Sequence, residues 1–548
     1  MPQHPDLSQR SSLFQPFRSA DFRLLWSAVL VSNLGGLIQA VGAGWMMASI
    51  ADSDDMVALV QTATTLPIMI FSLAAGALAD SFDRRTVMLV AQSLMMTASV
   101  ALAVLAIQGW ITPWLLLLFT FLIGCGTALH NPSWQASMGD LVPRSDIPSA
   151  VTLNSMAFNL MRSIGPAVGG FIVASVGAAG AFALNAVSYA PLILALTRWT
   201  RRRAPSPLPR ESFQLAMSAG IRFVAMSPNL VTVIGRAFLF GLGAISILAL
   251  LPLVARDLVS GGAATFGILL GSFGVGAIGG AFMNTRLRER YTSEVIARGA
   301  FVAFALSAVL VGNSRQTWLT CLALLPAGAS WVLALSLFNV TVQLSTPRWV
   351  VGRALSIYQT ATFGGMAAGS WIWGLLADAY DPSRALIAAG GFLTLGALIG
   401  LRFAIPPLLA LDLDPLDQFR EPEVRLELRS RSGPIMVMVD YEIDQADVPA
   451  FLAVMAERRR VRIRDGARQW ALLRDLENPG TWTETYHVPT WVEYVRHNMR
   501  RTKADAEINE RLLSLHRGPG RPRVHRMIER QTVTPTDDMP IKEHPDVP

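Results

Sequence analysis

Long apolar stretches separated by short polar segments run through the first 406 residues of this chain. Each stretch is long enough to cross a hydrocarbon layer of about 30 Å as an α-helix. The twelve predicted spans are residues 24–50, 56–79, 86–107, 113–138, 151–174, 180–197, 229–254, 264–284, 295–312, 317–342, 354–377 and 384–406. The pattern predicts an all-α membrane protein with twelve transmembrane helices.

After residue 406 the pattern changes to the shorter periodic stretches of a soluble domain. Apolar alternation and turn residues predict strands at 434–443, 470–476, 481–488 and 522–529. Helical stretches at 445–464 and 492–516 fall between them, the second broken near Thr502. The order β-α-β-β-α-β predicts a small α+β domain of the ferredoxin-like kind.

These patterns divide the chain into membrane and soluble parts. The predicted segments are a cytosolic N-terminal segment 1–23, six-helix halves 24–197 and 229–406, a cytosolic linker 198–228, a second linker 407–433, the ferredoxin-like domain 434–530 and a disordered tail 531–548. Apolar residues at helical spacing over 213–226 predict an amphipathic helix on the membrane surface. A plain tether between the halves is a sufficient alternative.

Composition supports this division. The chain is 52% hydrophobic with a mean hydropathy of +0.41, too apolar for an ordinary soluble protein. Residues 1–406 carry 24 basic and 15 acidic side chains, whereas 407–548 carry 22 and 24. The basic residues of the body lie in short loops beside apolar spans, so no nucleic-acid binding is predicted. Cys125 and Cys321 both fall inside spans, and no disulfide framework is predicted.

Arginine placement orients the spans. With the N-terminus in the cytosol, nineteen of the 24 body arginines fall in cytosolic segments, and three, Arg256, Arg315 and Arg384, fall in the opposite loops. We therefore predict a multi-pass protein of the bacterial cytoplasmic (inner) membrane with both termini in the cytosol. The first 23 residues are polar, and no cleavable signal peptide is expected.

One loop sequence recurs at an offset of 204 residues. The first copy runs Gly76-Ala-Leu-Ala-Asp80-Ser-Phe-Asp-Arg84-Arg85, and the degenerate second copy carries Asn284 in place of the acid and ends at Arg288. Parallel halves of this kind are typical of one large class of membrane transporters. The first copy resembles the loop signature of the major facilitator superfamily, and the resemblance covers residues 20–406.

The resemblance implies a latch, built from these loop residues, that closes the cytosolic side during transport. Asp80 would face the positive end of a neighbouring helix that starts near Ala354. Arg84 would pair with Asp80 or with lipid phosphate. For Arg85, positive-inside anchoring is an equally good explanation.

Other runs, at 143–154, 162–170 and 185–188, look like the exporter subgroup that includes the enterobactin exporter. The residues Gly165, Pro166, Gly169 and Gly170 resemble part of the family's antiporter signature, although Met161 stands where the family has a further glycine. A proline with paired glycines makes a helix face that a partner helix approaches closely. Helix packing is therefore the default role for this group.

Polar side chains inside the spans are candidates for a substrate cavity, because burying them in lipid is costly. The set is Asn33, Gln39, His130, Asn131, Gln135, Arg162 and Gln359. Arg162 is the strongest candidate, with Asp140 as its candidate partner and a purely structural tie as the alternative. Arg236 is expected to extend to the headgroups. Singly, each neutral residue is better explained by a hydrogen bond between helices.

As a set, these residues predict a mostly neutral cavity with one cation, suited to an amphipathic or anionic small molecule. No Asp or Glu falls in the central third of any predicted span. Proton coupling would then need His130 or the Asp140–Arg162 region, and His130 is the predicted carrier because its side chain titrates near neutral pH.

The soluble tail looks like the small barrel of antibiotic-biosynthesis monooxygenases, by its pattern and by the run 462–467. That resemblance implies self-association through the sheet. His487, Trp491 and His497 are candidate pocket residues. The sequence shows no metal-ligating or nucleophilic constellation, so no catalytic residue, metal or cofactor is predicted, and a structural or regulatory role is favoured.

We predict a transporter and not an enzyme: a secondary active exporter of a drug, siderophore or secondary metabolite, working by alternating access with protons as the coupling ion. Its predicted partners are the small-molecule substrate and the lipid bilayer. Two alternatives stay open. One is a membrane-anchored protein whose tail is an enzyme or a ligand sensor, and the other is an uptake transporter for small solutes.

Overall fold

The computed structural model describes residues 14–81, 83–143, 146–199, 213–347, 349–405, 416, 419, 421–422, 424–426, 428 and 432–529. The side chains of 73–81, 148, 155, 158–159, 162–163 and 213–216 lie outside the described part. The chain forms two compact units. The body unit comprises residues 1–210, 232–341 and 355–407, and the tail unit comprises 211–231, 342–354 and 408–548.

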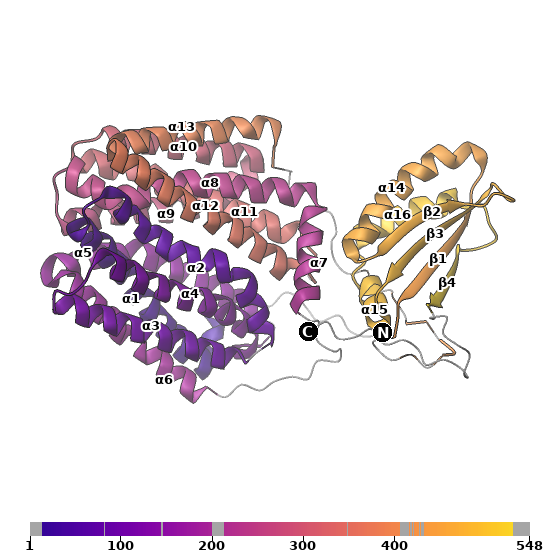
Figure 1. Cartoon of the computed structure of the whole chain (residues 1–548), viewed down its shortest axis with the longest axis horizontal. Coiled ribbons are helices and arrows are strands. Elements are labelled where there is room, and N and C mark those ends of the chain that lie inside the picture. Colours follow the sequence, from indigo (N-terminus) through magenta and orange to yellow (C-terminus); the bar gives the residue numbers. More distant parts are fainter. Residues whose placement is uncertain are drawn as a thin grey trace. The chain divides into compact units, whose positions relative to one another are not determined.

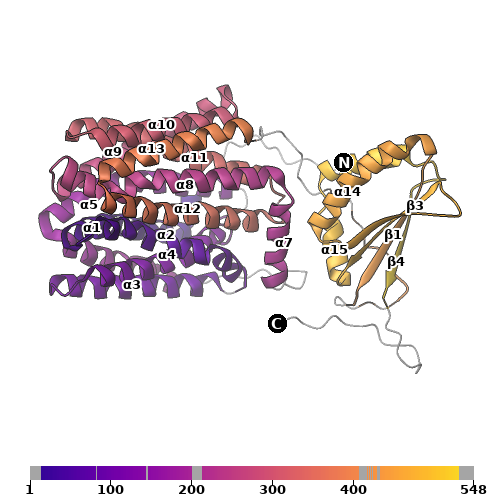
Figure 2. The same cartoon turned by 45° about the horizontal axis from the view of Figure 1, so that its top comes forward.

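The body is helical throughout its described residues. The first half of the chain forms α1 (Ala20–Ile50), α2 (Asp54–Ser81), α3 (Arg84–Ile107), α4 (Pro113–Leu141), α5 (Ile147–Ser188) and α6 (Ala190–Arg198). The second half forms α8 (Pro228–Leu253), a π-helical turn Val254–Leu258, α9 (Ala263–Arg290), α10 (Ser293–Asn313), α11 (Thr317–Leu344), α12 (Val351–Ala379) and α13 (Pro382–Arg402). In Figures 1 and 2 the indigo-to-purple helices of the first half lie together, beside the pink-to-orange helices of the second.

Ten helical stretches of the described chain are long and apolar enough to cross a membrane, rather than the twelve predicted. The fifth and sixth predicted spans are joined in the stretch Ile164–Arg198. Gly177 interrupts that stretch with a φ of +76°, a conformation that glycine adopts readily, so the helix breaks where the two spans were predicted to separate. Helix α12 covers the predicted span 354–377 but is not among the ten.

Capping residues set where the body helices begin. Thr112 accepts a hydrogen bond from the Leu115 amide, and Pro113 opens α4. Asp83 in the same way caps α3 by accepting from the Arg85 amide at 3.3 Å. This cap places the two adjacent arginines of the predicted loop signature on the first turn of α3.

The tail unit contains an antiparallel sheet with helices. Its elements are α7 (Phe213–Ala225), β1 (Ile435–Glu442), a 3-10 turn Gln445–Asp447, α14 (Val448–Asp465), β2 (Arg468–Arg474), β3 (Thr481–Val488), α15 (Trp491–Met499), α16 (Lys503–Leu515) and β4 (Arg523–Ile528). The strand order is β2-β3-β1-β4, with every neighbouring pair antiparallel. Strands and helices therefore follow one another in the predicted order, and the predicted break near Thr502 is the gap between α15 and α16.

The core of the tail forms on one face of the sheet. Alternate residues of β1 are buried, from Ile435 to Tyr441, as a strand with one covered face requires. Phe451 of α14 and Tyr486 of β3 complete this core. At the start of α16, Thr502 and Asp505 form a capping box, which explains why the predicted helix is broken there.

Candidate functional site

The first copy of the loop signature ties three helices of the body together. The Arg84 guanidinium, at the start of α3, lies 3.2 Å from the Asp140 carboxylate at the end of α4. It also donates to the Ala136 carbonyl oxygen at 2.7 Å. Arg85 donates to the carbonyl oxygens of Leu196 and Thr197, each at 2.8 Å, and so satisfies the exposed end of α6.

Asp140 has a partner that the sequence-based prediction did not name. It was expected to face Arg162, and in the structure it pairs with Arg84, while its contact with Arg162 stays a prediction. The side chains of Gly76, Asp80 and Arg162 lie outside the described residues, so the predicted contact of Asp80 with a helix near Ala354 stays a prediction. Asp140 follows an apolar span at the same end as Arg84, and that shared depth was the signal that could have identified the pair.

In the second copy the arginine is held by neutral partners. Arg288 donates from Nε to the Asn284 Oδ1 at 2.9 Å, and its NH2 donates to the Ser336 hydroxyl at 3.2 Å. The Asn284 amide also donates to Ser336 at 3.0 Å. The arginine thus joins α9 to α11 through neutral partners, as the first copy joins α3 to α4 through a charged one.

A third polar cluster, which sequence reasoning missed, connects the two halves. Arg256, in the π-helical turn after α8, lies 3.2 Å from the Asp54 carboxylate at the start of α2 and donates to the Ala48 carbonyl oxygen at the end of α1. The Asp54 amide donates to the Asp378 carboxylate of α12 at 3.1 Å. On the predicted orientation this cluster lies on the side of the membrane opposite the loop signatures.

The predicted antiporter-like motif lies at helix contacts of the body. Gly165 and Gly169 face α1, where a Cβ atom would collide with Leu37 or with Val41. A Cβ atom on Gly170 would collide with the backbone of Gly267 in α9. Pro166 is buried beside these glycines. The close approach of α5 to both helices supports the packing role for this group.

The predicted cavity residues occupy different surroundings. Gln39 is buried in a network in which the Ser99 hydroxyl donates to its Oε1 at 2.9 Å, and Asn185 donates to the same oxygen. His130 is also buried, and its Nδ1 has no hydrogen-bond partner among the described residues. Asn33 and Gln359 are half-buried, whereas the side chains Asn131 and Gln135 are exposed on α4. Among contacts between described residues, only Gln39 of this set shows the interhelical hydrogen bonds expected of a neutral residue considered alone.

Arg236 does not extend outward as predicted. Only 2% of the residue is exposed, and it lies 3.6 Å from the Glu294 carboxylate. It donates to the Gly396 carbonyl oxygen at 2.7 Å, and its guanidinium lies 4.8 Å from the centre of the Phe301 ring. Glu294 also pairs with Arg298 at 3.3 Å. The acid from α10 and the ring and carbonyl around it hold the arginine inside the body.

The tail unit has its own buried carboxylate between two arginines. Glu484 of β3 accepts from Arg458 Nε at 2.8 Å and from Arg462 Nε at 3.2 Å, both on α14. The Tyr441 hydroxyl and the Trp470 indole complete its shell at 3.2 and 3.1 Å. Burial alone would raise the pKa of Glu484, but the two guanidiniums outweigh it and lower the pKa to about 2.

Of the three predicted pocket residues of the tail, only His497 lines the cavity described below. Its Nε2 lies 3.1 Å from Arg462 NH1, so this nitrogen accepts and the proton belongs on Nδ1, which faces the Asp465 carbonyl oxygen at 3.4 Å. Burial and then the neighbouring Arg462 charge lower the pKa of His497 well below its usual value. Trp491 instead donates to Glu421 at 2.7 Å.

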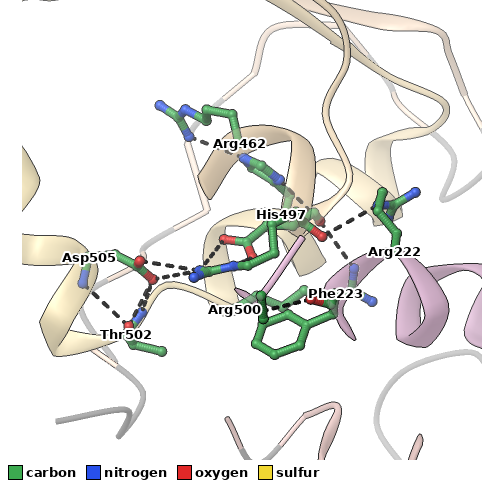
Figure 3. Close-up of polar contacts among 10 residues, drawn as sticks. Arg222, Phe223, Arg462, His497, Arg500, Thr502 and Asp505 are labelled. Atoms are coloured by element: carbon green, nitrogen blue, oxygen red, sulfur yellow. Dashed lines mark hydrogen bonds and ion pairs between the residues drawn. The ribbon is translucent and has the colours of Figure 1, made fainter. Parts of the chain in front are cut away.

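Helix α7 packs against the end of α14 within the tail unit, as Figure 3 shows. Arg222 Nε donates to the Arg464 carbonyl oxygen at 3.4 Å, and the Arg464 guanidinium lies 5.2 Å from the centre of the Phe223 ring. Phe223 meets Trp349 edge to face, and the Arg500 guanidinium lies 4.2 Å from the centre of the Trp349 ring. The linker between the two halves of the body therefore contacts the soluble domain directly.

The family model for transmembrane secretion effectors matches residues 11–533, which is nearly the whole chain. The protein belongs to the transmembrane secretion effector family. This family is part of the major facilitator superfamily, so the protein is a multi-pass membrane transporter and not an enzyme.

Two relatives of this family member are an exporter and a transporter with named substrates. It is 28% identical to the enterobactin exporter of Salmonella typhimurium over 392 residues, which cover 69% of this chain and 91% of the relative. It is 27% identical to the staphyloferrin A transporter of Staphylococcus aureus over 168 residues, 30% of this chain and 42% of the relative. The predicted resemblance to the exporter subgroup is thereby confirmed as a distant relationship.

Solved structures of transporters share the fold. A POT family transporter bound to a peptide conjugate aligns with a TM-score of 0.57 at 14% identity, covering 70% of this chain and 96% of that one. A bacterial homologue of the lysosomal transporter Spinster, in an inward-facing and unoccupied conformation, aligns with a TM-score of 0.56 at 14% identity, covering 71% and 97%. At this identity the likeness establishes the helical transporter fold and nothing finer.

Proposed function

We propose that the protein is a secondary active exporter of small molecules in the bacterial cytoplasmic membrane, with siderophores as the first substrate class to test. The observation that carries the proposal is the match of the body, over 91% of the relative's length, to the enterobactin exporter. The staphyloferrin A transporter, a second relative, is also named for a siderophore. Both termini are proposed to lie in the cytosol, as the arginine distribution predicts.

The polar clusters of the body support alternating access as the mechanism. The cluster around Arg256 joins helices of the two halves at one end. The clusters around Arg84 and Arg288, in contrast, hold helices within one half each. Contacts that join the halves must break when the halves rock, whereas contacts within a half can persist. Arg84, Arg85 and Arg288, with Gly76 and Asp80, are proposed to form the cytosolic latch.

Protons are proposed as the coupling ion, with His130 as the carrier. His130 is buried in α4, and its Nδ1 lacks a partner among the described residues, which leaves that nitrogen available to a proton. Gln39, Asn33, Gln359, Asn131, Gln135 and Arg162 are proposed to surround the transported molecule.

The tail is proposed to have a ferredoxin-like fold similar to the small barrels of antibiotic-biosynthesis monooxygenases, and to associate with a second copy through its sheet. The element order and the strand order β2-β3-β1-β4 support the fold. The contact of its α14 with the linker helix α7 supports a regulatory role for the tail in transport.

Inverted membrane vesicles test the proposed function, with enterobactin and staphyloferrin A as probes. An imposed proton gradient should drive time-dependent accumulation of at least one probe, and a protonophore should abolish it. Arg84→Ala should lower the initial rate roughly ten-fold, which corresponds to about 1.4 kcal/mol, because the ion pair that joins α3 to α4 is lost. Arg286→Ala, which removes an exposed charge from α9, is the matched control.

Each outcome decides one part of the proposal. Failure of both probes to accumulate would contradict a siderophore substrate, and accumulation only in right-side-out vesicles would indicate uptake. Accumulation that persists after the proton gradient collapses would contradict proton coupling. His130→Ala should flatten the rate between about pH 5.5 and pH 8, and an unchanged profile would remove His130 as the carrier.

A further inference from the structure

The tail unit encloses a cavity of about 790 Å³. One wall is the covered face of β1, with Val437 and Val439, and the opposite wall comes from α14, α15 and α16. This volume lies within the range that suits a drug-sized ligand. The cavity lies wholly within the soluble tail, apart from the transport path proposed for the body.

The charge in this cavity is unbalanced. Among the described residues, five arginines and three acids line it, an excess of two positive charges. Two of the acids are already engaged, since Asp465 and Asp505 both pair with Arg464, at 2.9 and 3.2 Å. Glu484, which does not line the cavity, is shared between Arg458 and Arg462 and has no capacity left for another cation.

Three lining arginines, Arg501, Arg521 and Arg526, have no acid partner among the described residues, and Arg501 is the least exposed of the three. It lies in the turn between α15 and α16, where its backbone carbonyl accepts from the Leu416 amide at 3.0 Å. Its guanidinium has no hydrogen-bond or ion-pair partner in the part of the chain that the structure describes. Burial, followed by the charges of Arg462 and Arg458, lowers the pKa of Arg501 to about 10, so it still carries its charge at neutral pH.

A half-buried guanidinium with no counter-charge among the described residues is costly, and two further guanidiniums nearby increase that cost. A bound anion would remove it. Arginine is also the side chain best suited to a carboxylate, because its planar fork donates two parallel hydrogen bonds.

We propose that the tail cavity binds a small aromatic carboxylate whose acid group pairs with Arg501. The ring of such a ligand would lie against the apolar face formed by Val437 and Val439, with the tyrosines Tyr486 and Tyr494 beside it. Neutral His497 adds no charge of its own and orients Arg462 through its Nε2. The site is a ligand-binding site in the tail. The proposal therefore does not depend on which substrate the body transports.

The test uses the full-length protein in lipid nanodiscs, with 1-naphthoate and the neutral isostere 1-naphthamide as probes. Hydrogen exchange measured by mass spectrometry localises binding to peptides, which separates the tail cavity from the membrane body. At about 1 mM, 1-naphthoate should slow exchange in β1, α15 and the start of α16, with little change in the body helices. The amide should need at least ten-fold higher concentration for the same protection.

Two variants identify the residue responsible. Arg501→Gln should weaken 1-naphthoate at least ten-fold and leave 1-naphthamide unchanged, whereas Arg501→Lys should keep part of the preference for the anion. Arg523→Gln, on exposed β4 outside the cavity lining, should behave like the parent protein. Equal protection by acid and amide in the parent protein, or no protection by either, would overturn the proposal even if Arg501→Gln failed to fold. Undiminished binding by folded Arg501→Gln would overturn it as well.

Discussion

Two buried glutamates, one in each unit, each lie between two arginines, yet their surroundings differ. In the body, Glu294 of α10 pairs with Arg236 at 3.6 Å and with Arg298 at 3.3 Å. In the tail, Glu484 of β3 pairs with Arg458 at 2.8 Å and with Arg462 at 3.2 Å. Both clusters place one negative charge between two positive charges.

The two clusters differ in the surroundings of the arginine whose charge the glutamate does not neutralise. Arg298 in the body is 35% exposed and can hydrate, while Arg236 donates to a backbone carbonyl and lies over the Phe301 ring. In the tail, Glu484 is fully buried, and its two arginines line a cavity that also holds Arg501, which has no ion-pair partner among the described residues. A glutamate with two arginines, here called a triad, can therefore hold helices together or contribute to a binding site. Which of the two it does depends on whether the surplus positive charge faces water and backbone or a cavity.

The largest effect is expected from removing the acid in the tail. Glu484→Ala leaves Arg458 and Arg462 buried without their counter-charge, which should cost about 3–5 kcal/mol of local stability. Hydrogen exchange of the full-length protein should show faster exchange throughout β1, β3 and α14. Glu477→Ala, in the exposed turn between β2 and β3, is the control. Unchanged exchange in Glu484→Ala would mean that the arginines find other partners.

Acid should reproduce that effect more gradually. The pKa of Glu484 is lowered from 4.5 to about 2 in the folded tail, so its contribution is present above pH 4.5 and is lost as the pH falls toward 2. The total corresponds to about 3 kcal/mol. Exchange of the Glu484 peptides, corrected for the intrinsic rate at each pH, should accelerate across this window in the parent protein but not in Glu484→Gln. Equal acid sensitivity of the two proteins would contradict a lowered pKa.

How much of each triad the sequence predicts depends on its separation along the chain. Arg458 and Arg462 are one turn apart in a predicted helix, and Glu294 and Arg298 have the same spacing, so each local pair can be identified from the sequence. The third member comes from a distant element in both cases. Arg236 was expected at the headgroups because it lies near the cytosolic side of its predicted span, and Glu484 could be assigned only once the strand faces were known.

The same limit applies to the body, where the sequence locates the helices but not the distant partners of their polar side chains. Hydropathy located the helices, and it separated the fifth and sixth predicted spans at the position where Gly177, with a φ of +76°, breaks the helix. The loop signature identified Arg84, whereas its partner Asp140 comes from another helix. The cluster of Arg256, Asp54 and Asp378 joins three helices of both halves, and no single stretch of sequence contains that information.

The body triad should tolerate the same substitution better, and this is the sharpest test of the comparison. In Glu294→Ala, Arg236 keeps the Gly396 carbonyl and the Phe301 ring, Arg298 can turn toward water, and the lost acceptor is that of the Ile405 amide at 2.8 Å. The cost should be about 1–3 kcal/mol, confined to the joint of α8, α10 and α13. Thermal unfolding in nanodiscs measures it, with exposed Glu289→Ala as the control. A loss of stability equal to that of Glu484→Ala would show that the Gly396 carbonyl and the Phe301 ring do not compensate the charge of a buried arginine. The cavity would then be the one remaining difference between the two triads.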